Sequence, residues 1–378
     1  MILAGVGRLV FRTAEGFERH NRPAVVYSRL LASRSLYLHA SMHVRSIAGP
    51  GMAKWSGDPI WIDCDAGSDD AVGIMLAASA NLVGISSVRG NTAAEQVSKN
   101  VLRVLTLCSR QDVPVYTGED KSLNGQQQPI PKWSGQDGLS DQPAVFPTSD
   151  SISSRPTPGV ASDKMSDAAQ HHAGQLVIIA LGPLTNVAVA LQYHPDLAAN
   201  VKRLVIMGGN EAYNDWTSTG AEFNFYCDPD AAEEVIRKFA GKTTLLTWEC
   251  MQRNPLPQSL ARALAQKDSN KARFVSAICD LESLGSKQEE GWVPCDPLAV
   301  AAALDGSVIT GATDVLCKVE IKDPDKRGQT YFHKLAEELK SSELCGDQND
   351  QGSQTSCLAT SGATAIRDMC FMPAAKRV

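Results

Sequence analysis

The stretch Trp61-Ile62-Asp63-Cys64-Asp65-Ala66-Gly67-Ser68-Asp69-Asp70 carries four carboxylates within eight residues. It follows a short apolar run and precedes a helical pattern, so we predict a strand ending near Ile62 and a helix beginning near Asp69. Carboxylates this close repel one another unless a cation lies among them. Because open α/β folds bind their ligands at the carboxyl edge of the sheet, this turn predicts metal-dependent chemistry.

The rest of the chain alternates between strand-like and helical patterns. This order predicts an α/β fold with a doubly wound, mostly parallel central sheet flanked by helices. Residues 118–162 lack periodicity, and we expect them to form a mobile flap near the site. The predicted strands are 60–63, 82–89, 176–180, 203–207 and 243–247, and the predicted helices are 69–80, 93–109, 184–192 and 230–239.

Three regions differ in composition. Residues 1–54 hold eight Lys and Arg against two Asp and Glu, which is typical of an organelle transit peptide or of a disordered extension. We assign residues 55–332 to one catalytic domain. Residues 333–378 are rich in Ser, Gln and Asp, and we expect a flexible polar tail there.

Composition also excludes several classes of protein. The net charge is −6 and the basic residues gather in the leader, so the acidic body argues against nucleic-acid binding. No apolar run is long enough to cross a membrane, and we expect no membrane partner. The ten cysteines include no CxxC pair, which favours a reducing compartment. We expect a cytoplasmic protein, or an organellar one if residues 1–54 are a transit peptide.

Further blocks follow the acidic stretch in a recognisable order. With Asp63-Cys64-Asp65-Ala66-Gly67-Ser68-Asp69-Asp70 they make the chain resemble the inosine–uridine-type nucleoside hydrolases over roughly residues 58–332. One block would be weak evidence, whereas seven in order are strong. They are Arg89-Gly90-Asn91, Asp137-Gly138-Leu139, Leu181-Gly182-Pro183-Leu184-Thr185-Asn186, Met207-Gly208-Gly209, Ala221-Glu222-Phe223-Asn224, Cys295-Asp296-Pro297-Leu298-Ala299 and Arg327-Gly328-Gln329-Thr330.

The acidic residues suit the chemistry that this resemblance implies. Hydrolysis of an N-glycosidic bond needs an activated water and a polar cradle for the sugar. Asp65, Asp70 and Asp296 would offer hard oxygen ligands for Ca²⁺, and the resemblance adds the backbone carbonyl of Leu181. A water on the metal has a lowered pKa, and Asp65 would take its proton as the general base. We expect one Ca²⁺ and no organic cofactor.

The resemblance also implies a set of sugar ligands on neighbouring loops. Glu222 and Asn224 lie two positions apart, so extended backbone would point both side chains to one face. Met207 would offer an apolar contact under the ribose ring. The implied substrate-binding set is Asp69, Asn91, Met207, Asn214, Glu222, Asn224 and Asp296.

The chain departs from the family where the leaving base is protonated. Cys295 and Ser134 stand where relatives commonly have histidines, and the seven histidines of this chain fall elsewhere. Three explanations stay open: Cys295 donates the proton as a catalytic thiol, the base stacks on a tryptophan before it leaves, or the enzyme is weak or acts on a base that leaves unaided. The candidate tryptophans are Trp133, Trp216, Trp248 and Trp292.

Two smaller departures accompany this one. Trp248-Glu249-Cys250 replaces a triplet that commonly contains Asp, which concerns the outer wall of the pocket. Ala66 stands where proline is common, and we expect both residues to allow the turn.

We therefore predict a nucleoside N-ribohydrolase that inverts the anomeric centre of a small nucleoside substrate. Relatives commonly form homodimers or homotetramers, and we expect the same here. The alternatives are a catalytically weak or silent nucleoside- or ribose-binding protein, a metal-dependent phosphohydrolase of the haloacid dehalogenase type, and a domain that calcium merely stabilises. The sequence does not give the preferred base.

Overall fold

The computed structural model describes residues 57–131, 133–152, 154–281, 292–334 and 366–370. The predicted leader at 1–54 lies outside these residues, as does most of the predicted tail. Within the described ranges, no helix is both long and apolar enough to cross a membrane.

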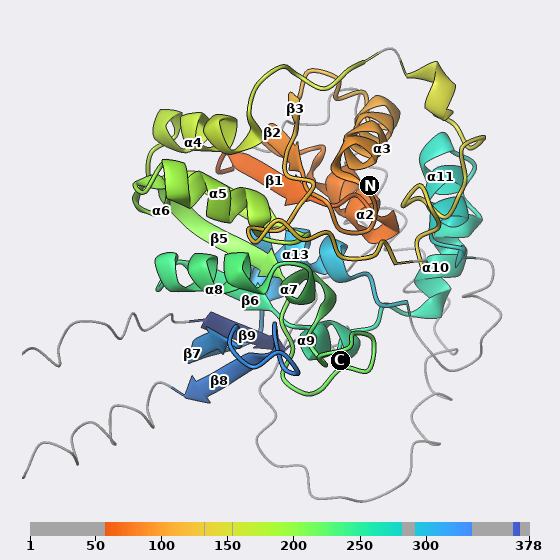
Figure 1. Cartoon of the computed structure of the whole chain (residues 1–378). Coiled ribbons are helices and arrows are strands. Elements are labelled where there is room, and N and C mark those ends of the chain that lie inside the picture. The colour runs from red at the N-terminus through yellow and green to blue at the C-terminus, as the bar shows by residue number, and fades with distance from the viewer. Residues whose placement is uncertain (1–56, 132, 153, 282–291, 335–365, 371–378) are drawn as a thin grey trace, which may run out of the picture.

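A parallel sheet of six strands forms the centre of the molecule, in the order β3-β2-β1-β4-β5-β6 (Figure 1). The order reverses between β1 and β4, which is the point where doubly wound sheets bind ligands. The predicted fold class is therefore confirmed. The strands are β1 (Ile60–Cys64), β2 (Leu82–Ser87), β3 (Val115–Thr117), β4 (Leu176–Ala180), β5 (Val201–Met207) and β6 (Thr243–Leu246).

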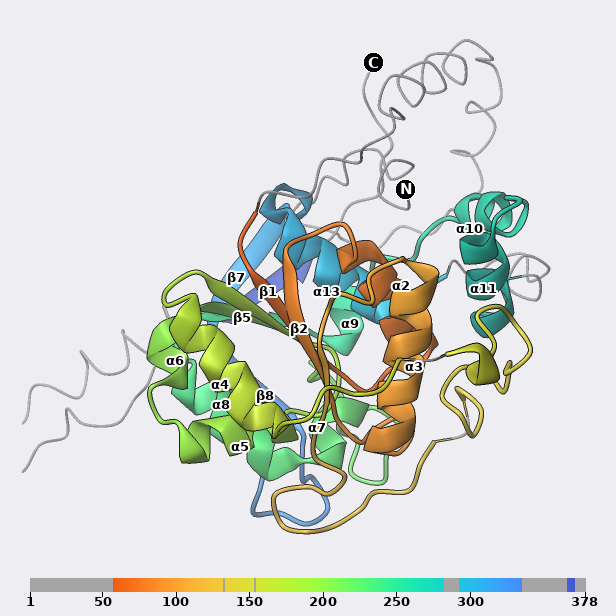
Figure 2. The same cartoon turned by 90° about the horizontal axis from the view of Figure 1, so that it is seen from above.

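Helices cover both faces of this sheet, as Figure 2 shows from above. Alternate side chains of β1 face opposite cores: Ile62 packs with the helices of one layer and Trp61 with those of the other. One layer contains α2 (Ser68–Ala77), α3 (Ala94–Leu107) and α13 (Cys295–Leu304). The other contains α4 (Ala161–His171), α5 (Thr185–Tyr193), α6 (Leu197–Asn200) and α8 (Pro229–Lys238).

The close packing of α2 on α13 bears directly on the site. Both helices are apolar along most of their length, as expected of helices buried on all sides. A Cβ atom on Gly73 would lie 3.3 Å from Val300 Cγ2 and 3.5 Å from Asp296 Cβ. Glycine at this position therefore lets the first turns of the two helices approach each other.

Shorter elements surround the carboxyl edge and one end of the sheet. A second, antiparallel sheet has the order β8-β7-β9. Its strands are β7 (Gly311–Val319), β8 (Thr330–Lys334) and β9 (Ile366–Cys370). The remaining helices are α7 (Phe223–Cys227), α9 (Trp248–Gln252), α10 (Gln258–Ala265) and α11 (Asn270–Ile278), with 3₁₀ turns at η3 (Ser149–Ser151) and η4 (Gly306–Val308).

The structure corrects several sequence predictions. β8 runs past residue 332 to Lys334, and β9 lies inside the predicted tail, where it pairs with β7. Glu222 has the predicted extended backbone, but it caps the short helix α7, which contains Asn224, so the prediction of extended backbone is wrong for Asn224. Within the predicted flap, the described residues contain only η3 and the start of α4 as helical structure.

Candidate active site

Two helix N-termini bring carboxylates together at the point where the strand order reverses. Asp69 and Asp70 lie in the first turn of α2, which follows β1, and Asp296 lies in the first turn of α13. One oxygen atom from each of these three side chains lies within 4.8 Å of the others. We call these residues, together with Asp65, the acidic cluster.

Hydrogen bonds fix the acidic cluster from the side of β1 and β2. The backbone N–H of Asn91 donates to Asp65 Oδ2 at 2.8 Å, and that of Gly67 donates to Asp70 Oδ2 at 2.9 Å. The side chains of Asp65 and Asp296 both lie close enough to Asp70 to shift its pKa. Asp70 is therefore the centre of the cluster, with the predicted general base Asp65 beside it.

The cluster has the chemistry of a cation site. Burial raises the pKa of Asp70 to about 7, and the charge of Asp69 adds to the shift. Burial also raises the pKa of Asp65 and of Asp296 well above the usual range, and the neighbouring carboxylates contribute. Asp70 Oδ1 is buried and has no hydrogen-bond partner within the described structure. An all-oxygen set with an unpartnered buried oxygen fits a hard divalent cation, which would let the carboxylates ionise together.

Of the four predicted metal ligands, Asp70 and Asp296 belong to the group of three close carboxylates, and Asp65 and Leu181 do not. The structure groups Asp70 and Asp296 with Asp69, a predicted sugar ligand, whereas Asp65 contacts this group through Asp70. The carbonyl oxygen of Leu181 accepts a hydrogen bond of 2.8 Å from Asn224 Nδ2. A carbonyl oxygen has a second lone pair, so this contact leaves Leu181 able to bind a cation.

The turn between β1 and α2 depends on an uncommon backbone conformation. Ala66 has φ +31°, in the left-handed region that non-glycine residues rarely adopt. Proline fixes φ near about −65° and cannot take this conformation. The expectation that alanine and proline serve equally at this position is therefore wrong for this backbone.

Glu222 and Asn224 form a polar wall at the start of α7, and Asn224 reaches the predicted metal ligand Leu181. The carboxylate of Glu222 accepts backbone N–H groups of Gly209 at 3.0 Å, Asn224 at 2.9 Å and Phe225 at 3.2 Å. Burial raises the pKa of Glu222 to about 7, against the lowering effect of these three donors. Asn224 Nδ2 also lies 3.1 Å from the carbonyl oxygen of Met207 and 3.6 Å from its sulfur. These contacts hold Asn224 against Met207, the residue predicted to make an apolar contact with the ribose ring.

Asn214 is placed differently from the other predicted sugar ligands. Its Oδ1 accepts the backbone N–H of Trp216 at 2.9 Å, and its own N–H donates to the carbonyl oxygen of Gly220 at 2.9 Å. These contacts shape its own loop, as asparagine commonly does in turns. These two hydrogen bonds of Asn214 therefore lie within its own loop, next to Trp216.

Aromatic side chains gather beside Asn91 and form what we call the aromatic cluster: Trp133, Trp216, Phe223 and Trp248. The ring centroids of Trp133 and Trp216 are 5.8 Å apart, those of Trp133 and Phe223 are 5.0 Å apart, and those of Trp216 and Trp248 are 5.1 Å apart. Trp133 is 49% exposed and Trp216 62% exposed. Exposed indole faces beside a polar cradle suit a planar ligand.

One hydrogen bond joins the aromatic cluster to the acidic cluster. Trp133 Nε1 donates to Asn91 Oδ1 at 3.0 Å, and Asn91 Nδ2 points to Asp70 Oδ2 at 3.5 Å. Trp292, the fourth predicted stacking residue, is instead buried in the core and pairs with Leu256.

Cys295 is a buried wall residue at the start of α13. Its thiol points to the carbonyl oxygen of Val293 at 3.9 Å. Burial raises the pKa of Cys295 well above its usual range, and the charges of Asp69 and Glu222 add to the shift. A proton donor works best with a pKa near the working pH, so this environment does not favour Cys295 as the leaving-group acid.

The described histidines lie away from the acidic cluster. His171 and His172 end α4 near the amino edge of the sheet, His194 pairs with Asp163 at 2.9 Å, and His333 is exposed on β8. The other three, His20, His39 and His43, lie outside the described residues.

Sequence reasoning missed two positioning residues. Asn210 Oδ1 accepts the backbone N–H of Glu222 at 3.1 Å, and its own N–H donates to Thr330 Oγ1 at 2.9 Å. Glu249 accepts the backbone N–H groups of Glu211 at 2.7 Å and Ala212 at 3.0 Å. The signal for Asn210 was its position directly after the Met207-Gly208-Gly209 block, whereas Glu249 gave none beyond its departure from the family triplet.

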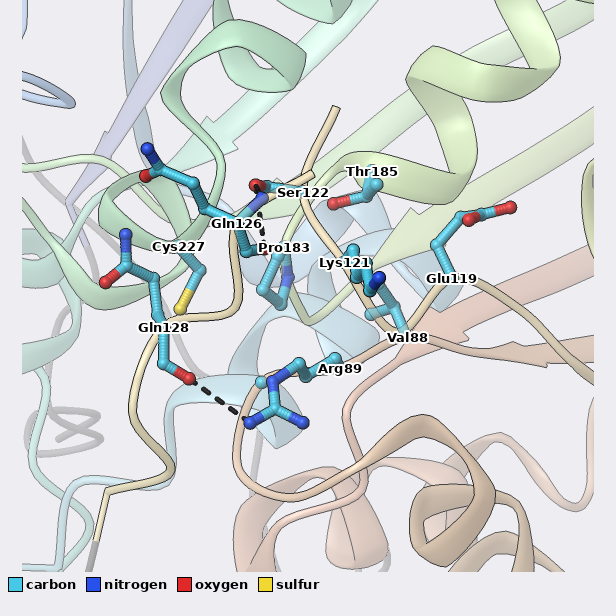
Figure 3. A pocket seen from close by; sticks show the side chains of 11 residues that line it. Val88, Arg89, Glu119, Lys121, Ser122, Gln126, Gln128, Pro183, Thr185 and Cys227 are labelled. Atoms are coloured by element: carbon cyan, nitrogen blue, oxygen red, sulfur yellow. Dashed lines mark hydrogen bonds between the residues drawn. The ribbon is translucent and has the colours of Figure 1, made fainter. Parts of the chain in front are cut away.

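A polar pocket lies beyond the ends of β2 and β4 (Figure 3). It is lined by segments that follow β2 and β4 and by the first part of the flap, including Arg89, Lys121 and Gln128. Arg89 donates to the carbonyl oxygen of Gln128 at 3.3 Å and pairs with Asp120 at 3.5 Å. The residues of the acidic cluster do not line this pocket. The contacts of Arg89 with Gln128 and Asp120 hold the first part of the flap at the edge of the sheet.

The fold and the site together define an α/β protein with an oxygen-only cation site beside a polar cradle. The family model described as inosine-uridine preferring nucleoside hydrolase matches residues 60–360. The chain therefore belongs to this family.

Curated relatives match over a shorter segment. The pyrimidine-specific ribonucleoside hydrolase RihA of Salmonella typhimurium is 41% identical over 182 residues, which cover 47% of this chain and 57% of that protein. RihA of Salmonella typhi matches with the same identity and coverage. The chain thus spans little more than half the length of these relatives.

Solved structures match over more of the fold. A plant nucleoside hydrolase, PpNRh1, has a TM-score of 0.67 and 25% identity, covering 82% of this chain and 93% of its own. An inosine-guanosine nucleoside hydrolase has a TM-score of 0.66 and 26% identity, covering 76% of this chain and 91% of its own.

Proposed function

We propose that this protein hydrolyses the N-glycosidic bond of ribonucleosides to free base and ribose, with one Ca²⁺ as its metal. The observation that carries the proposal is that the acidic cluster lies at the reversal of strand order, where the wall of Glu222 and Asn224 reaches the carbonyl oxygen of Leu181 just after β4. Family membership and the relatives' names support the same reaction.

The acidic cluster would hold the cation through Asp70, Asp296 and the carbonyl of Leu181, with Asp65 and Asp69 beside it. When bound, Ca²⁺ would lower the pKa of a water molecule and orient ribose hydroxyl groups. Asp65 is positioned by the Asn91 backbone to accept a proton from the attacking water. The water oxygen bonds to the anomeric carbon from the face opposite the base, which inverts the configuration. The electron pair of the broken C–N bond leaves with the base.

Ribose recognition falls to groups that are already held in place. Asp69, Asn91, Glu222, Asn224 and Asp296 would bind the hydroxyl groups, and Met207 would contact the apolar side of the ring. Because Asn91 and Glu222 are fixed by their own hydrogen bonds, binding costs little ordering of side chains.

The aromatic cluster would receive the departing base. A base stacked on Trp133 or Trp216 spreads the charge that develops as the C–N bond breaks, and solvent then supplies its proton. Cys295 would serve as a wall of the pocket. This arrangement explains how the site could work with no histidine among the described residues near the acidic cluster.

A panel assay tests the proposal. Chelator-treated protein is incubated with purine and pyrimidine ribonucleosides, with and without CaCl₂, and released reducing sugar is measured. We expect free ribose only with added Ca²⁺, released about 10²–10⁴-fold more slowly by Asp65→Asn. Model phosphate esters in the same panel test the phosphohydrolase alternative. Absence of ribose release from every nucleoside, in protein that binds Ca²⁺, would contradict the proposal.

A silent nucleoside-binding protein is the second candidate. The observation that favours it is Cys295, a buried thiol where relatives commonly have an acid for the leaving base. Calorimetry separates the two candidates, since a silent protein would bind a nucleoside with Ca²⁺ present and release neither base nor ribose.

A further inference from the structure

Asn100 is a buried amide on the apolar face of a helix. It lies in α3 on the face that carries Val97, Val101 and Val104, and its side chain is fully buried. A buried amide without partners destabilises a fold, so its hydrogen bonds show what the residue does.

The side chain of Asn100 connects two segments that are far apart in the sequence. Its Nδ2 donates to the carbonyl oxygen of Ala66 at 3.1 Å and to that of Asp137 at 2.7 Å. Its Oδ1 accepts Gln96 Nε2 at 3.1 Å. One amide nitrogen therefore holds both the acidic turn and the flap.

The bond to Ala66 bears on the geometry of the acidic cluster. Ala66 follows Asp65 directly and has the left-handed φ of +31°. Its conformation sets the direction in which the chain leaves Asp65 and enters the first turn of α2, where Asp69 and Asp70 lie. A residue in this region needs support from its surroundings, and Asn100 supplies it.

The bond to Asp137 bears on the aromatic cluster. The next residue, Gly138, has φ +80°, and a Cβ there would lie 3.1 Å from Asn100 Nδ2 and 3.3 Å from the carbonyl oxygen of Ala66. The same part of the flap carries Trp133, whose indole N–H donates to Asn91. The flap is thus attached to the cation side of the site at Asn100 and at Asn91.

We propose that Asn100 is a positioning residue that locks the acidic turn and the flap from Trp133 to Asp141 into one unit. Cation binding and ordering of the flap are then coupled: the cation stabilises the flap, and the flap stabilises the cation site. The proposal rests on the proposed function for the identity of the cation, Ca²⁺. It adds that the order of the flap regulates the affinity of the site for this cation.

Two variants of Asn100 and one matched control test the proposal. Asn100→Ala removes the amide, and Asn100→Asp keeps its size while removing both N–H donors. Ser98→Ala is the control because Ser98 is also fully buried in α3, but bonds to Ser87 and Thr117 instead. Calorimetry with CaCl₂ gives the Kd, and hydrogen exchange of the segment 133–145 reports the flap.

We expect both Asn100 variants to weaken Ca²⁺ binding about 10-fold or more, the range for outer residues that hold metal ligands. Exchange of the segment 133–145 should become faster in both variants, and added Ca²⁺ should slow it less than in the wild type. Ser98→Ala should lose stability but keep the Kd and the exchange rate. Wild-type Kd and exchange in Asn100→Asp would overturn the proposal.

Failure of the proposed function gives a different result. If the wild type binds Ca²⁺ but releases no ribose, the hydrolase proposal fails, and the Kd values still decide the role of Asn100. If the wild type binds no Ca²⁺, the coupling is overturned, and exchange in the metal-free variants shows whether Asn100 holds the flap alone.

Discussion

The acidic cluster and the aromatic cluster lie on either side of Asn91 and are built in opposite ways. The acidic cluster comes from helix N-termini at the sheet edge, and its central residue Asp70 is fully buried. The aromatic cluster comes from loops and short helices, and Trp133 and Trp216 are largely exposed. The ribose, which all ribonucleosides share, would bind at the acidic cluster. The base, which differs between nucleosides, would bind at the aromatic cluster.

This difference separates catalysis from substrate choice. Changes at the acidic cluster should affect hydrolysis of every nucleoside equally. Changes to the exposed ring faces of the aromatic cluster should alter the ranking of bases more than the Ca²⁺ affinity.

The largest effect is expected from Asp65→Asn. The amide cannot accept the proton of the attacking water, so kcat should fall by about 10²–10⁴-fold for purine and pyrimidine ribonucleosides alike. Initial rates of ribose release measure it, with circular dichroism to verify folding. A rate near that of the wild type would remove Asp65 as the general base.

Glu222→Gln should change how stability depends on pH. Burial raises the pKa of Glu222 to about 7, so the folded state holds this proton more tightly than the unfolded state does. The resulting stability is fully present below pH 4.5, the usual pKa, and is lost as the pH rises through 7. In chelated protein, the loss between pH 4.5 and 8 should be smaller by about 3 kcal/mol in the variant.

Urea unfolding at several pH values measures this slope. Glu95→Gln is the control, because Glu95 is exposed and pairs with Lys99 on α3. Equal slopes for the wild type and Glu222→Gln would show that Glu222 stays ionised in the folded protein.

Trp133→Ala should affect the base side of the site. Stacking of a base on an aromatic ring contributes about 1–3 kcal/mol, so kcat/KM should fall about 10–100-fold. Trp133→Phe keeps a ring and loses the hydrogen bond to Asn91, so it separates stacking from positioning. A uniform loss in both variants, with no change in the ranking of bases, would assign Trp133 to the positioning of Asn91.

The smallest effect is expected from Cys295→Ser. The buried thiol contacts a backbone carbonyl oxygen, and a hydroxyl group can make the same contact. The pH profile and kcat should therefore stay within about 2-fold of the wild type, since the substitution removes no group used in the reaction. Loss of the alkaline limb of the profile would restore Cys295 as the proton donor, because a general acid stops working when it ionises at high pH.

The sheet and the acidic cluster could be predicted because their signals are local. Apolar runs locate β1, β2, β4, β5 and β6 within two residues at every end, and the acidic stretch begins at the end of β1. β3 is too short, at three residues, to show a period. β9 pairs with a strand from a distant part of the chain, and only that pairing defines it.

The errors within the site have physical causes of their own. Phe223 and Phe225 alternate as in a strand, yet Glu222 accepts backbone N–H groups and caps a helix instead. Asn100 and Asn210 act by binding backbone groups, and a sequence does not show which carbonyl oxygen or N–H group will face them. The conformation of Ala66 follows from such contacts and not from its own preference.

The central claim is that the N-termini of α2 and α13 share one divalent cation. Titration calorimetry of CaCl₂ into chelator-treated protein tests it most directly, with Asp296→Asn as the variant and Asp228→Asn, a buried helix cap outside the cluster, as the control. We predict one Ca²⁺ per chain in the wild type and the control, and binding weaker by about 100-fold or more in Asp296→Asn. Wild-type protein that binds no Ca²⁺, or an Asp296→Asn variant that binds it as tightly as the wild type, would contradict the account.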